Sequence, residues 1–148
     1  LSKNTDDLKS VYKKTRSEGF GPEIKRAIMM GTYTLSAGYY DAYYLKAAKV
    51  RTLIIQEYAN AFREVDVMLT PVSPFLPFKI GEKMSDPLQM YLADIFTVTP
   101  SIAGICGIAI PTEKIGNIMT GVQLLGPQLG EEKIINFGWH LEQAYAPF

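Results

Sequence analysis

Cysteine, histidine and surplus charge are all scarce in this 148-residue chain. Its single cysteine, Cys106, cannot form an intramolecular disulfide, which fits a reducing compartment, so we expect a cytoplasmic protein. The 15 basic and 15 acidic residues cancel to a formal net charge of zero, so the chain lacks the basic surface that non-specific nucleic-acid binding requires. No apolar run approaches the ~18–20 residues of a membrane helix, and the first residues do not resemble a secretory signal. We therefore expect no association with a membrane.

The residue types that usually carry catalysis or bind metals are isolated in this sequence. His140 is the only histidine, and no second histidine or cysteine lies at ligand spacing, which excludes a zinc site. Cys106 has no histidine near it in sequence and is interpreted as a small buried hydrophobe. Neither a glycine-rich phosphate loop nor a Gly-x-Ser-x-Gly motif is present. From its residues alone, we predict no catalytic residue, metal ligand or cofactor within the chain.

Hydrophobic periodicity and turn signals predict an α/β fold with about three strands. Short apolar runs rich in β-branched residues predict strands at residues 65–69, 107–110 and 119–125. The last two flank a turn with Gly116 and are expected to form a hairpin. Helices are predicted at residues 7–17 (capped by Thr5 or Asp6), 23–35 (opened by Pro22), 39–63, 88–95 and 131–145. A break is expected between Gly31 and Gly38, because glycine weakens a helix.

Asp94 stands out because it lies in apolar company within the predicted helix 88–95. Its neighbours are Leu92, Ala93, Ile95 and Phe96. Burying an unpaired carboxylate costs free energy, so two interpretations stay open. Asp94 is either a surface acid, or it binds the ammonium group of a substrate while a guanidinium elsewhere binds the carboxylate. Those two contacts together would recognise a free amino acid.

A resemblance to a known family rests on three segments that cover nearly the whole chain. They read TRSEGFGPEIKRAIMMGTYTLSAGYYDAYYLKAAKVRTLI, DVMLTPVSP and DPLQMYLADIFTVTPSIAG. They resemble the C-terminal part of amidase-signature enzymes, and the hairpin sequence GIAIP…TGVQLLGP with the acidic helix start after it is similar to the end of that part. The resemblance implies that residues 1–148 form the C-terminal part of an amidase domain, a mixed β-sheet flanked by helices.

Within this family, the chain is most similar to the amidase subunits of tRNA-dependent amidotransferases. The resemblance implies release of ammonia from glutamine for the ATP-dependent conversion of Glu-tRNA(Gln) to Gln-tRNA(Gln). The implied partners are subunits B and C, glutamine and the mischarged tRNA, while ATP and Mg²⁺ serve the whole complex. The family uses a serine nucleophile, a second serine in a cis peptide arrangement and a lysine base, all in an N-terminal segment that this chain lacks. The isolated chain is therefore predicted to be inactive.

Two site residues follow from the resemblance. Asp94 matches the acid that holds the α-amino group of glutamine, and the arginine for its α-carboxylate lies in the helix that here reads Lys25-Arg26-Ala27. Family members usually have a basic residue where this chain has Ala27, so that role is either lost or passed to Arg26, about 100° around the helix axis. The alternatives are a general amidase of the same family and, in another class, a non-catalytic module that binds partner subunits.

Overall fold

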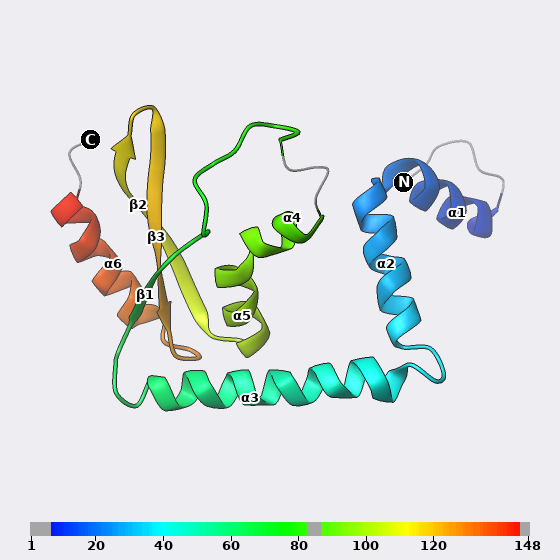
Figure 1. Cartoon of the computed structure of the whole chain (residues 1–148), viewed down its shortest axis with the longest axis horizontal. Coiled ribbons are helices and arrows are strands. Elements are labelled where there is room, and N and C mark those ends of the chain that lie inside the picture. The colour runs from blue at the N-terminus through cyan, green and yellow to red at the C-terminus, as the bar shows by residue number, and fades with distance from the viewer. Residues whose placement is uncertain (1–6, 83–86, 146–148) are drawn as a thin grey trace. The chain divides into compact units, whose positions relative to one another are not determined.

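A computed structural model of the chain describes residues 7–82 and 87–145 (Figure 1). The chain divides into two units, residues 1–49 and 50–148. The predicted caps Thr5 and Asp6 lie outside the described residues. Within the described residues, no helix is long and apolar enough to cross a membrane.

The first unit contains two helices that the sequence predicted closely. Helix α1 (Leu8–Gly19) is capped by Asp7, whose carboxylate accepts a hydrogen bond from the Ser10 amide at 2.9 Å. This corrects the prediction of a cap at Thr5 or Asp6. The hydrogen bonds from the Ser10 hydroxyl and amide also lower the pKa of Asp7. Helix α2 (Pro22–Thr34) begins at Pro22 as predicted, since the missing N–H of proline costs nothing at a first helical position.

The predicted helix at residues 39–63 is wrong at both ends. Gly38 has a φ of +87° and breaks the chain after α2 as expected, but residues Tyr40–Leu45 then form a π-helical segment, η1. Helix α3 (Lys46–Ala61) follows it and crosses into the second unit. Backbone bonds from Phe62 and Val65 to the carbonyls of Tyr58 and Ala61 close its C-terminal end.

The second unit is built on a three-stranded antiparallel sheet with the strand order β1-β3-β2. Strand β1 (Met68–Pro71) begins three residues later than predicted, because the residues up to 65 complete the end of α3. Strands β2 (Cys106–Ile115) and β3 (Ile118–Gly126) form the predicted hairpin, whose turn needs the positive φ of Gly116 (+63°). The chain thus contributes the three strands that its sequence predicted.

Helix α6 (Glu131–Tyr145) covers one face of this sheet and forms the core (Figure 1). Ile134 packs with Ile110 and Leu124, and Leu124 is completely buried. Gly138 lets the helix approach closely, since a Cβ there would lie 2.8 Å from the Ile110 Cδ1 atom. An exposed ion pair of 2.6 Å joins Lys133 of α6 to Asp66 just before β1, and this hydrogen bond lowers the pKa of Asp66.

Helices α4 (Pro87–Ala93) and α5 (Ile95–Ala103) belong to the same unit and lie on the other side of the sheet from α6 in Figure 1. The prediction of one helix at 88–95 followed by an irregular segment is wrong, because the chain resumes a helix after Asp94 in spite of Pro100. Proline has no N–H, so the carbonyl of Phe96, four residues earlier, loses its helical donor. The buried amide of Gln123 replaces that donor: its Nε2 atom donates to Phe96 O at 2.7 Å and to Thr70 Oγ1 at 2.9 Å.

Replacing Gln123 by methionine tests this account of α5. Gln123→Met should lower the free energy of unfolding by about 1–3 kcal/mol, because it leaves the half-buried Phe96 carbonyl without a donor. Urea unfolding followed by the fluorescence of Trp139, the only tryptophan, measures the change. Gln128→Met is the matched control at an exposed position and should have little effect. In a Pro100→Ala background the loss should shrink, since alanine restores a backbone donor; equal losses in both backgrounds would contradict the compensation.

Candidate functional site

Asp94 occupies the break between α4 and α5. Its backbone carbonyl accepts hydrogen bonds from the amides of Thr97 (3.0 Å) and Val98 (2.9 Å), which begins α5. An N-cap aspartate usually accepts an amide hydrogen bond with its carboxylate, but Asp94 has φ −99° and ψ 8° rather than an extended backbone and makes no such side-chain bond. Among the described residues it also forms no ion pair. The exposed carboxylate is therefore available to a ligand.

Contacts from α3 and a C-terminal glycine hold the opposite side of α5 in place. Within the second unit, the Tyr58 hydroxyl lies 3.2 Å from Thr99 Oγ1, and the Arg51 guanidinium donates through Nε to Ile102 O at 2.9 Å. Gly104 ends the helix in the left-handed conformation, with φ of +72°. These contacts fix the orientation of the helix and leave its outer face to solvent.

That outer face forms an open hollow of about 520 Å³. It is lined by Asp94, Thr97, Val98, Ser101 and Ile102. The polar side chains in it are one carboxylate and two hydroxyls, a set that suits binding of a cation. Sequence reasoning missed Thr97 and Ser101, because α5 was not predicted; their spacing of three and seven residues from Asp94 is the signal that a helix there would have revealed.

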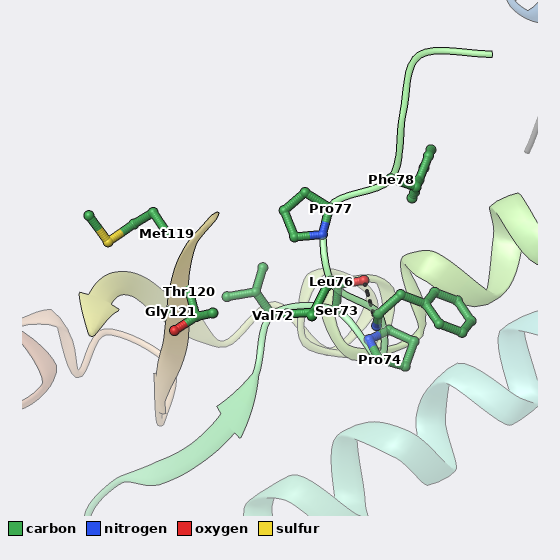
Figure 2. A pocket seen from close by; sticks show the side chains of 10 residues that line it. Val72, Ser73, Pro74, Leu76, Pro77, Phe78, Met119, Thr120 and Gly121 are labelled. Carbon is green, nitrogen blue, oxygen red and sulfur yellow. Dashed lines mark hydrogen bonds between the residues drawn. The ribbon is translucent and has the colours of Figure 1, made fainter. Parts of the chain in front are cut away.

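A second hollow, of about 430 Å³, lies between the loop after β1 and the start of β3 (Figure 2). It is lined by Val72, Ser73, Pro74, Phe75, Leu76, Pro77, Phe78, Met119, Thr120 and Gly121. Ser73 Oγ accepts the Phe75 amide at 3.4 Å, and Thr120 Oγ1 donates to Glu113 O at 2.6 Å. None of these ten lining residues has a titratable side chain, so they can receive an apolar group but offer no acid or base.

Arg26, the other predicted site residue, lies on α2 in the first unit. Its Nη2 atom donates to Glu23 Oε2 at 2.6 Å, an i,i+3 ion pair at the surface. Ala27 beside it is exposed. Arg26 and Asp94 belong to different units, so their joint action on one substrate stays a prediction.

The residues interpreted as non-functional have structural surroundings. Cys106 is half-buried, and its Sγ atom donates to Pro127 O at 3.1 Å. His140 is exposed on α6, with its ring edge-on to Trp139 at 4.8 Å between centroids. In the part of the chain that the structure describes, no three His, Cys, Asp or Glu side chains gather into a metal site.

Comparisons with known proteins agree on one family. Residues 2–135 match the family model described as Amidase. The A subunit of glutamyl-tRNA(Gln) amidotransferase from Geobacter sp. (strain M21) is 53% identical over 152 residues, which cover 97% of this chain and 31% of that relative. The crystal structure of the corresponding protein from Thermotoga maritima is 42% identical, with a TM-score of 0.69, and covers 93% of this chain and 30% of that one.

A further crystal structure, that of an amidase, shares the fold. Its TM-score is 0.71 at 23% identity, and the match covers 90% of this chain and 31% of that one. The chain thus spans about 30% of the length of each of these relatives.

The geometry around Asp94 predicts that its carboxylate does not hold the fold together. Asp94→Ala should change the free energy of unfolding by less than about 0.5 kcal/mol, since no capping bond or ion pair is lost. Urea unfolding followed by Trp139 fluorescence measures this. Asp7→Ala is the positive control: it removes a real cap on α1 and should cost about 1 kcal/mol, seen as lost helicity by circular dichroism. A loss above about 1 kcal/mol for Asp94→Ala would make Asp94 a structural acid.

Proposed function

Because the chain belongs to the amidase family, we propose that it forms part of the glutamine-hydrolysing subunit of a tRNA-dependent amidotransferase. The observation that carries the proposal is the similarity of nearly the whole chain to the A subunits of glutamyl-tRNA(Gln) amidotransferases. The predicted amidase-signature fold is confirmed by the solved structures that share it.

The proposed reaction has two stages, carried out by the whole complex. Glutamine is hydrolysed to release ammonia, and the ammonia then amidates glutamate on tRNA(Gln) at the expense of ATP in the presence of Mg²⁺. Subunits B and C and the mischarged tRNA are the proposed partners. In this proposal the nucleophile and the nucleotide site lie outside residues 1–148, and the part of these residues in the reaction is to bind the substrate.

Asp94 is the residue best placed for that part. Its exposed carboxylate lacks a capping bond, lines an open hollow and suits the α-ammonium group of glutamine. Arg26 is proposed to bind the α-carboxylate, because a guanidinium can donate two parallel hydrogen bonds to a carboxylate. Arg26 already donates to Glu23, so the substrate carboxylate has to replace or share that partner.

Exposed apolar side chains also support a role within a larger assembly. Helix α2 has no buried residue, and Ile24, Ile28 and Met29 each expose half or more of their surface. Helix α4 likewise exposes Leu88 (66%) and Tyr91 (53%). Surfaces of this kind in a protein usually mark contacts with other protein.

The first test of the proposal concerns activity. Purified residues 1–148 should release no ammonia from glutamine above background, because no residue in them is predicted to form an acyl-enzyme with an adjacent base. A chimera in which this chain replaces the matching 30% of the Thermotoga maritima relative should release ammonia and serves as the positive control. Ammonia release by a contaminant-free preparation of the chain alone would disprove this division of labour.

The second test concerns Asp94 in that chimera. Asp94→Ala should remove a charge-assisted hydrogen bond to the substrate ammonium, worth about 1.5–3 kcal/mol. This corresponds to a roughly 10- to 150-fold lower kcat/KM for glutamine, with the enzyme remaining folded. The companion variant Ala27→Arg should lower KM for glutamine if the family's basic residue is missing at that position. Normal glutamine kinetics in folded Asp94→Ala enzyme would refute the ammonium-binding role.

A further inference from the structure

Two hydroxyl groups share the hollow on α5 with the Asp94 carboxylate. Thr97 and Ser101 follow Asp94 by three and seven residues, so all three lie on one face of the helix. Val98 and Ile102 complete the lining with apolar surface. Thr97 is half-buried and Ser101 is exposed.

The hydrogen atoms of both hydroxyls are already engaged. Thr97 Oγ1 donates to Asp94 O at 3.1 Å, and Ser101 Oγ donates to Thr97 O at 2.8 Å. A carbonyl oxygen can only accept, so each hydroxyl must be the donor and has only lone pairs left for a ligand. The polar side chains that line this hollow are therefore acceptors alone.

An acceptor-only surface selects for a ligand with several N–H donors and positive charge. A primary ammonium group has three donors, whereas a neutral hydroxyl ligand has one and an anion has none. The N-terminal end of a helix carries a partial positive charge, which opposes a cation, so the full negative charge of Asp94 is needed at this position. The hydroxyls then add hydrogen bonds without adding charge.

We propose that Thr97 and Ser101 extend Asp94 into a three-point subsite for a primary ammonium group. The inference rests on the proposed function and deepens it: Asp94 supplies the charge, and the two hydroxyls distinguish an α-amino amide from an amide that lacks the amino group. Both residues act in ground-state binding, at the opposite end of the substrate from the amide that is cleaved.

Kinetics of the chimera with two related compounds test this subsite. Thr97→Val and Ser101→Ala should each raise KM for glutamine by about 3- to 10-fold with kcat unchanged, because binding is lost equally in the ground and transition states. Inhibition by glutaramate, which is glutamine without its amino group, should be unaffected by either variant. Thr97→Ser keeps the hydroxyl and should keep the wild-type KM.

Thr32→Val is the matched control. Thr32 Oγ1 likewise donates to a helical carbonyl, Ile28 O at 2.8 Å on α2, but Thr32 does not line the hollow. This variant should change neither KM nor the inhibition constant of glutaramate. Urea unfolding of all variants separates a loss of binding from a loss of stability.

Three results would overturn the subsite. They are an unchanged KM in both Thr97→Val and Ser101→Ala, an equal weakening of glutamine and glutaramate, and the same effect from Thr32→Val. If Asp94→Ala still lowers kcat/KM in those cases, only the role of the hydroxyls is wrong. If Asp94→Ala also has normal kinetics, the proposed ammonium-binding role of Asp94 fails with it.

Discussion

The buried amide of Gln123 is the interaction on which the second unit depends. It lies on the central strand β3 and uses both of its N–H groups on other elements: one on Thr70 of β1 and one on the Phe96 carbonyl of α5. The second bond satisfies a carbonyl that Pro100 leaves without a helical donor. A single polar side chain in an otherwise apolar layer thus fixes where α5 lies on the sheet, because any other position would leave polar groups unpaired away from water.

The arrangement of α5 separates a structural side from a binding side. Tyr58, Arg51 and Gln123 all contact the helix through groups that are used up in doing so. Asp94 and the hydroxyls of Thr97 and Ser101 are left on the outer face with unused lone pairs. A binding group on a helix that is held at several points loses little conformational freedom when it meets a ligand, which favours affinity.

The sequence predicted those parts of the fold whose stability is local. Helix α6 was predicted with the bounds that the structure has, since its apolar spacing and acidic first turn act within the helix itself. Helix α5 was missed because proline, glycine and small residues indicate an irregular segment, and the group that compensates for Pro100 lies on β3, far along the chain. The site was predictable only as Asp94: its hydroxyl neighbours follow from a helix that local signals do not reveal, and the Glu23 partner of Arg26 was not considered.

The two proposed contacts with glutamine differ in how much binding free energy each can contribute. Arg26 starts paired with the Glu23 carboxylate, so a substrate carboxylate exchanges one anionic partner for another, and a surface ion pair of this kind is worth about 0–1 kcal/mol. Asp94 starts with no ion pair among the described residues, so an ammonium group adds a new charge-assisted contact instead of replacing one. Under the proposed function, recognition of the amino group should therefore outweigh recognition of the carboxylate within this chain. A basic residue at position 27 in place of alanine would reduce that asymmetry, because Glu23 can pair with only one of two neighbouring cations as favourably as it now pairs with Arg26.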